Sequence, residues 1–149
     1  MALETVLLAV GRGDRERVEA LTATVTDIAG PAGATVVLAH VFGEDEYADV
    51  REKLDIEPAA EVTADDVAER YSTVREIRAT LADAGLDVVV RGGVGDYGDR
   101  VVELAGEEDA DLVVVGGRSR SPTGKAVFGS TAQSVMLNAP CPVTFVRGE

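Results

Sequence analysis

The sequence has few of the residues that disulfides, metal sites and covalent catalysis require. Its 149 residues include one cysteine, Cys141, one histidine, His40, and no tryptophan. A single cysteine excludes an internal disulfide and a cysteine metal cluster, and we expect Cys141, between two prolines, only to pack. His40 lies in an apolar run, where a packed neutral imidazole is expected. Without a second histidine or a reactive thiol, no Ser-His-Asp, Cys-His or zinc arrangement can be drawn.

Long apolar runs and basic residues are also scarce. No run is long enough to cross a bilayer, and the first ten residues lack the pattern of a signal peptide. We therefore expect a cytoplasmic protein without a membrane partner. Lysine and arginine number 14 against 27 aspartates and glutamates, which gives a net charge of −13 and disfavours nucleic acid as a partner. The acidity also suits a halophilic cytoplasm, and this hypothesis predicts unfolding in low salt.

The sequence does have a regular alternation of apolar runs and helical periods. We expect strands at 5–10, 35–41, 87–91, 111–115 and 143–146, and helices at 14–29, 65–84, 99–108 and 131–138. Residues 42–64 are expected to form a surface excursion with a helical turn near 47–54. Strands that are apolar on both faces predict an α/β fold with a five-stranded parallel sheet covered by helices on both faces. We expect one domain, residues 1–149.

Ligands of such a sheet bind beyond the carboxyl ends of its strands, where the strand order reverses. The predicted ends are Gly11, Val41, Gly92 and Gly116.

The stretch 113–135 is the strongest candidate for a binding site. An apolar strand breaks at Gly116 and Gly117, a basic loop follows, and a helix begins near Ser130, which has the capping-box spacing to Gln133. From residue 112 onward the net charge is +3, although the whole chain carries −13. Free backbone NH groups at a helix N-terminus attract anions, so a bound phosphate is favoured over a solvated loop.

The arrangement of strands and helices, the stretch from Gly116 to Ser130, and the closing NAPCPVTFVR resemble the universal stress protein family over essentially the whole chain. The resemblance implies a Rossmann-like domain of the adenine nucleotide alpha hydrolase-like type, and a dimeric stress-response protein that binds an adenine nucleotide, most often ATP. Its ATP-binding members carry a loop of glycine, two residues, glycine, nine residues, then glycine with serine or threonine. Gly116, Gly129 and Ser130 match this loop.

Two positions depart from the family pattern. Ser119 replaces the second glycine of the loop, and Gly11 stands where ATP-binding relatives usually have an aspartate. The resemblance places Ala9, Val10 and Val41 near the adenine and ribose. The predicted nucleotide-binding residues are Ala9, Val10, Gly11, Val41, Gly95, Val115, Gly116, Arg118, Ser119, Arg120, Lys125, Gly129, Ser130 and Thr131.

Other phosphate motifs fit less well. Gly124 and Lys125 resemble part of a P-loop, but Ala126 lacks the hydroxyl that binds Mg²⁺. Gly93, Gly95 and Gly98 satisfy GxGxxG, but no acid for a ribose follows at the usual distance, and a glycine-rich turn is the simpler interpretation. Asp96 and Asp99 are candidates for an accompanying Mg²⁺, although helix capping explains them more simply.

Catalysis has little support, because no residue can be named that positions a water molecule. The most that we expect is a slow hydrolysis of bound ATP. The run from Pro142 to Arg147 would leave an apolar sheet edge, which predicts a homodimer formed through that strand. The alternative is a family member that has lost nucleotide binding, as Gly11 and Ser119 would allow, and acts through protein–protein interaction.

Overall fold

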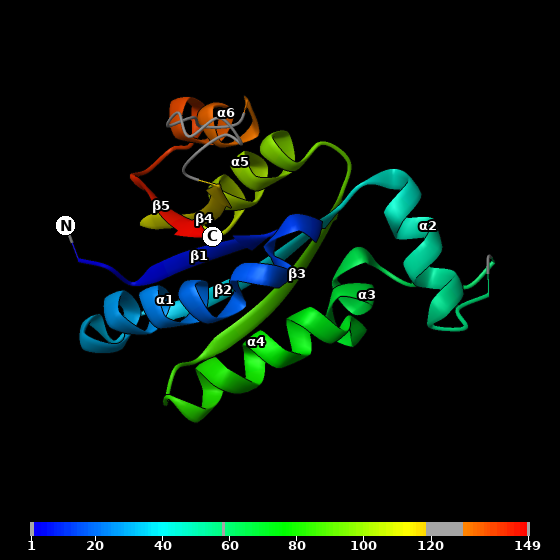
Figure 1. The fold of residues 1–149 in the computed structure, drawn as a ribbon, viewed down its shortest axis with the longest axis horizontal. Helices are drawn as coiled ribbons and strands as arrows, with labels where there is room; N and C mark the ends of the chain where they lie inside the picture. The colour runs from blue at the N-terminus through cyan, green and yellow to red at the C-terminus, as the bar shows by residue number, and fades with distance from the viewer. Residues whose placement is uncertain (1, 58, 119–129, 149) are drawn as a thin grey trace.

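The five predicted strands form one parallel sheet in the computed structural model, which describes residues 2–57, 59–118 and 130–148. The strand order is β3-β2-β1-β4-β5 (Figure 1). The strands are β1 (Thr5–Val10), β2 (Thr35–Phe42), β3 (Val88–Val94), β4 (Leu112–Arg118) and β5 (Val143–Gly148). The prediction of an α/β fold with a parallel sheet is confirmed.

The strand order reverses at β1. The chain runs outward from β1 to β2 and β3, and then returns to form β4 on the other side of β1, in the register Val6 with Leu112. β5 pairs with β4 and ends the described sheet on that side. The carboxyl ends of β1 and β4 therefore lie side by side at the switch point, where open parallel sheets bind their ligands.

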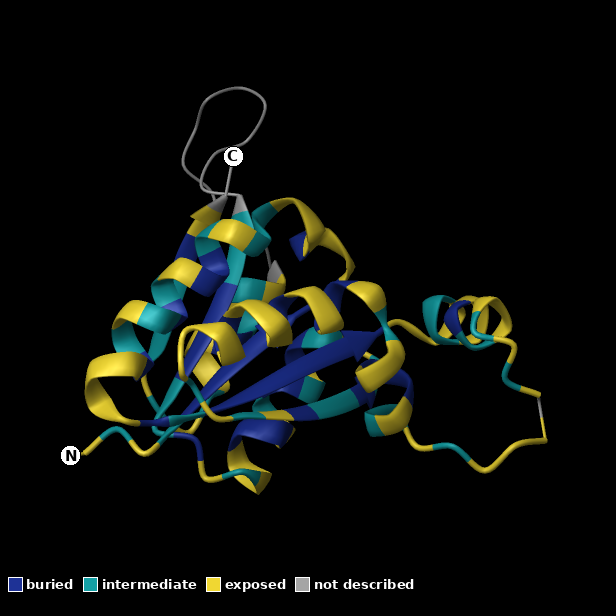
Figure 2. Cartoon of the chain, turned by 90° about the horizontal axis from the view of Figure 1, so that it is seen from below, coloured by how far each residue is buried: buried dark blue, intermediate teal, exposed yellow. Residues whose placement is uncertain are grey.

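Helices cover both faces of the sheet (Figure 1). Val6, Leu8 and Val10 of β1 face a core shared with α1 (Val18–Ala32), α3 (Ala64–Arg70) and α4 (Ser72–Asp83), whereas Leu7 and Ala9 face α5 (Tyr97–Glu107) and α6 (Ser130–Asn138). Figure 2 shows the buried sheet between helices whose outer surfaces are exposed. Because successive side chains of a strand point to opposite faces, a strand covered on both sides must be apolar throughout.

The excursion between β2 and β3 contains a helix, α2 (Glu44–Lys53), which projects beyond the carboxyl end of β2 (Figure 1). The single helix expected at 65–84 is wrong, because Tyr71 separates α3 from α4. Tyr71 has an extended conformation with ψ 131°. Its ring packs at 5.4 Å from the Phe42 ring and 4.7 Å from the His40 ring, between centroids. The aromatic cluster thus accounts for a break that no glycine or proline marks.

The predicted helix at 14–29 also differs. It begins as a 3-10 helix, η1 (Arg12–Arg17), and α1 continues through Pro31 before Gly33, in a left-handed conformation at φ 67°, ends it. β3 and β4 extend past their predicted ends at Gly92 and Gly116. Gly92 allows the start of α3 to approach β3 closely, because a Cβ there would lie 2.1 Å from the carbonyl oxygen of Ala64. Within the described residues, no helix is both long and apolar enough to span a membrane.

Candidate functional site at the carboxyl ends of β1 and β4

The switch point is closely packed around two glycines. Gly11 follows β1, and Gly116 lies near the end of β4. A Cβ on Gly116 would lie 3.0 Å from Oδ1 of Asp14 and 3.1 Å from Cδ of Arg17. The absence of a side chain at Gly116 is therefore what allows η1 to rest against β4.

Asp14 is the central polar residue of this region. Its side chain is 6% exposed, its Oδ2 accepts the N–H of Gly11 at 2.8 Å, and its Oδ1 lies 2.8 Å from Nη1 of Arg17. Burial raises the pKa of Asp14 above its usual value, whereas the hydrogen bond from Gly11 and the charge of Arg17 act in the opposite direction. The pair thus stabilises the sharp turn from β1 into η1.

Tyr97, the first residue of α5, packs against the end of β1 on the other face of the sheet. Its hydroxyl donates a 2.9 Å hydrogen bond to the carbonyl of Ala9, and a Cβ on Gly11 would lie 3.0 Å from two carbons of its ring. Burial, and then the charge of Asp14, raise the pKa of Tyr97 well above its usual range. A neutral phenol therefore packs directly on the backbone of Gly11, where an aspartate side chain would require the Tyr97 ring to move.

The predicted site residues that the structure describes lie at or near the carboxyl ends of four strands and at the start of α6, and the side chains of Ala9 and Val10 point to opposite faces of the sheet. Ala9, Val10 and Gly11 are buried at the end of β1, Val41 lies on the neighbouring β2, and Val115 and Gly116 lie on β4. Gly95 follows β3 with φ 129°, and its N–H donates to the carbonyl of Phe42 at 2.9 Å. Arg118 ends β4, and Ser130 and Thr131 begin α6. Ser119, Arg120, Lys125 and Gly129 lie outside the described residues.

The GxGxxG pattern has a structural explanation. Gly95 makes the turn after β3, and Gly98 in α5 lies against α6, because a Cβ there would be 3.3 Å from Oγ of Ser134. Asp96 caps α5 by accepting the N–H of Asp99 at 3.0 Å, as the simpler interpretation of these acids predicted. His40 is fully buried, as expected, and burial lowers its pKa to about 4. Cys141 is partly buried against the core beneath α5 and α6.

Sequence reasoning missed three residues of the site. Asp14 and Arg17 were assigned only to the start of a helix, and Tyr97 was not singled out. The signal for Asp14 is its position three residues after Gly11, the spacing at which a carboxylate reaches back to a backbone N–H. Tyr97 offers no comparable signal, because its contact joins residues 88 positions apart.

Comparison with known proteins places this fold in a family. Residues 3–147 match the model of the Universal stress protein family. A universal stress protein of Mycolicibacterium smegmatis is 37% identical over 79 residues, which cover 52% of this chain and 61% of that protein. The chain thus spans about three fifths of the length of this curated relative.

Two solved structures share the fold. A universal stress protein in complex with cAMP has a TM-score of 0.71 and 24% identity, and the match covers 100% of both chains. The universal stress protein from Archaeoglobus fulgidus in complex with dAMP has a TM-score of 0.67 and 22% identity, and the match covers 99% of this chain and 100% of that one. Together with the match of the family model along nearly the whole sequence, these similarities lead to one conclusion. The chain belongs to the universal stress protein family.

Proposed function

We propose that this chain is a cytoplasmic stress-response protein that binds an adenine nucleotide, ATP first among them, at the carboxyl ends of β1 and β4. The observation that carries the proposal is the switch point itself, where two strand ends meet with glycines at Gly11 and Gly116. The solved relatives in complex with cAMP and dAMP support an adenine nucleotide as the ligand class. Residues 1–149 act in this proposal as one domain.

The proposed binding mode divides the ligand between the strand ends and the loop. Ala9, Val10 and Val41 contact the adenine and ribose, and the base stays clear of the space over Gly11 that the ring of Tyr97 fills. The backbone NH groups of Gly129, Ser130 and Thr131 hold the phosphates at the start of α6. Arg118, Arg120 and Lys125 supply positive charge, and Mg²⁺ arrives bound to the nucleotide. The proposed output is a conformational or partner change, with at most slow hydrolysis.

A first experiment tests the ligand. The purified protein is denatured in its native salt range, released nucleotide is identified by mass spectrometry, and Mg·ATP is titrated calorimetrically. We expect an adenine nucleotide to co-purify or to bind, and Gly129→Val to weaken binding. The matched control is Gly106→Val, because a Cβ on Gly106 meets nothing within 4 Å. Absence of both signals at millimolar ATP would contradict the proposal.

A second candidate function is a dimeric family member without nucleotide. It is favoured by the departures at Gly11 and Ser119 and by the position of β5 at the edge of the described sheet. Pairing of two β5 strands across a two-fold axis would cover that edge. Light scattering in high salt measures the mass, and we expect a dimer. A monomer would remove the proposed interface, whereas a dimer without any bound nucleotide would favour this second function.

A further inference from the structure

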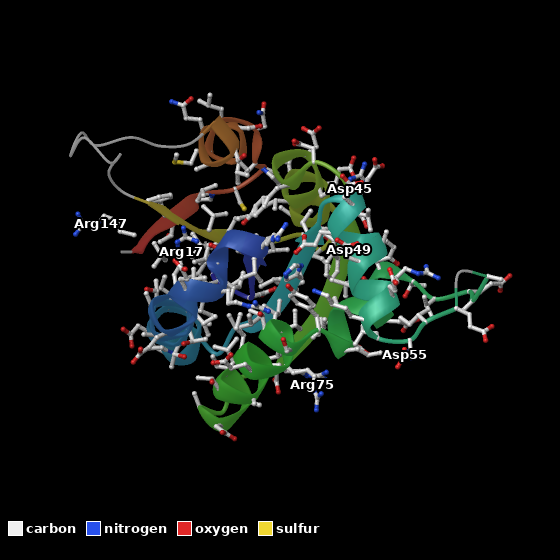
Figure 3. All side chains as sticks on the ribbon, turned by 45° about the vertical axis from the view of Figure 1, so that its right-hand side comes forward. Arg17, Asp45, Asp49, Asp55, Arg75 and Arg147 are labelled. Carbon is white, nitrogen blue, oxygen red and sulfur yellow. The ribbon has the colours of Figure 1, made fainter. Side chains whose placement is uncertain are left out.

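A pocket lies between η1 and α2 and has its own set of lining residues. It has a volume of about 530 Å³, and its walls come from η1, α2 and the junction between α3 and α4. It shares no lining residue with the predicted nucleotide site. Figure 3 labels Asp49 on α2 and Arg75 on α4, which belong to two different walls. Five basic side chains line the pocket: Arg12, Arg15, Lys53, Arg70 and Arg75.

No partner for these basic side chains lies in the part of the chain that the structure describes. Among the described residues, none of the five forms an ion pair or donates a hydrogen bond, whereas Arg17, Arg91 and Arg100 each contact a carboxylate. The pocket contains two acidic residues, of which Glu46 already accepts the N–H of Gly43 at 3.2 Å. Unpaired cations gathered in one cavity are unexpected in a chain with 27 acidic residues. The pocket therefore has an uncompensated positive charge.

The walls of the pocket are fixed by the folded core. In a 3-10 helix, side chains three positions apart lie one above the other, so Arg12 and Arg15 share one face of η1 while Asp14 and Arg17 anchor another face. Tyr71 lines the pocket, and its ring is held against Phe42 and His40. Val50 of α2, 7% exposed, belongs to the core. The basic side chains thus project from backbones that are already positioned.

We propose that this pocket binds a small soluble anion that carries two or more phosphate groups. Guanidinium groups donate paired hydrogen bonds to phosphate oxygens, and several of them around one cavity favour a ligand with more than one phosphate. Ser72 lines the pocket and is the first residue of α4. The N-cap residue of this helix, Tyr71, makes no side-chain hydrogen bond to the helix N-terminus, where an anion is favoured. The negative charge of the whole chain disfavours an anionic membrane as the source of these phosphates.

Calorimetric titration with inorganic pyrophosphate tests the proposal, in the lowest salt at which the melting temperature is unchanged. We expect Arg75→Gln to weaken binding about tenfold, because it removes a charged hydrogen bond, and Arg78→Gln to change it by less than about twofold. Arg78 is the matched control, since it is exposed on the same helix and does not line the pocket. Equal weakening by both variants would overturn the proposal, because it would indicate only a general charge effect.

A substitution that removes a negative charge from the pocket provides a second test. Asp49→Asn removes a carboxylate from the pocket and is expected to tighten pyrophosphate binding about threefold. Asp45→Asn, one turn earlier on α2 and outside the pocket, is expected to have no effect. Gly129→Val removes the contribution of the predicted nucleotide loop, and the pyrophosphate binding that remains in this variant is expected to keep its dependence on Arg75 and Asp49. No binding of pyrophosphate by the wild type, or loss of all binding in Gly129→Val, would overturn the proposal.

Discussion

The two faces of η1 use charge in opposite ways. On the inner face, Asp14 is buried and Arg17 is partly buried, and the two are paired with each other and packed against Gly116. On the outer face, Arg12 and Arg15 are exposed at the rim of a cavity, and no partner for either lies within the described ranges. Burial requires a charge to be compensated, so the inner pair contributes to the fold, whereas exposed cations remain available to a ligand. The comparison separates residues that matter for stability from residues that matter for binding.

The largest expected effect comes from the inner face. Asp14→Ala removes the acceptor of the Gly11 N–H and leaves Arg17 without its partner, and we expect a loss of about 3 kcal/mol in the free energy of unfolding. Urea denaturation at pH 7 measures this loss. Glu16→Ala, exposed on the same short helix, is the control and is expected to change stability by less than about 0.5 kcal/mol. Similar losses in the two variants would show that burial does not distinguish the faces.

His40 sharpens the comparison, because it is buried without any compensation. Among the described residues neither of its nitrogens has a hydrogen-bond partner, and burial lowers its pKa to about 4. In the unfolded chain the pKa returns to about 6.5, so the unfolded state binds more protons between these values. Stability is therefore expected to fall by roughly 3 kcal/mol as the pH decreases from about 6.5 to 4. His40→Phe should remove this pH-dependent loss of stability. Parallel profiles of unfolding free energy against pH for the two proteins would contradict the prediction.

Gly116 tests how tightly the inner face is packed. An added Cβ meets Asp14, Arg17 and Leu21 at 3.0, 3.1 and 3.2 Å, so Gly116→Ala is expected to cost about 2 kcal/mol. Gly106→Ala is the control of opposite sign, because it adds a methyl group to α5 with nothing within 4 Å and is expected to stabilise by about 0.5–1 kcal/mol. Thermal melting compares the two. A stabilising Gly116→Ala would show that η1 can move away from β4.

The smallest expected effect belongs to the outer face. Arg75→Gln should leave the free energy of unfolding within about 0.5 kcal/mol of wild type, because an exposed unpaired side chain contributes little to the fold. The same urea denaturation as for Asp14→Ala measures it. A loss above about 1 kcal/mol would indicate that Arg75 supports the structure. Weaker pyrophosphate binding by Arg75→Gln could then not be assigned to a lost contact with the ligand.

The sheet was predictable from the sequence because its signals are local. Runs such as TVLLAV and TVVLAHVF are apolar on both faces, and each became a buried parallel strand. The break at Tyr71 was not predictable, since it depends on a ring packing against Phe42 on another element. The close packing of η1 against β4 likewise depends on Gly116, about a hundred positions further along the chain.

The candidate site was predictable in position and not in detail. The sequence predicts Gly11 and Gly116 as two of the four strand ends at which a ligand would bind, and the strand order of the structure places these two ends next to each other. The Asp14–Arg17 pair and the Tyr97 hydroxyl bond to Ala9 require the relative placement of η1, β1 and α5. The basic pocket combines residues from η1, α2, α3 and α4, which no spacing in the sequence connects.

The reversal of strand order at β1 also bears on how the chain folds. β1 pairs with β2 across the single connection that η1 and α1 form, but the N–H groups of Glu4 and Thr5 bond to the carboxylate of Asp111, 107 and 106 positions away. Closing so long a segment costs more chain entropy than forming contacts between residues that are close in sequence. Contacts at this sequence separation slow folding. The central strand of the sheet therefore completes its second edge only after most of the polypeptide has been synthesised.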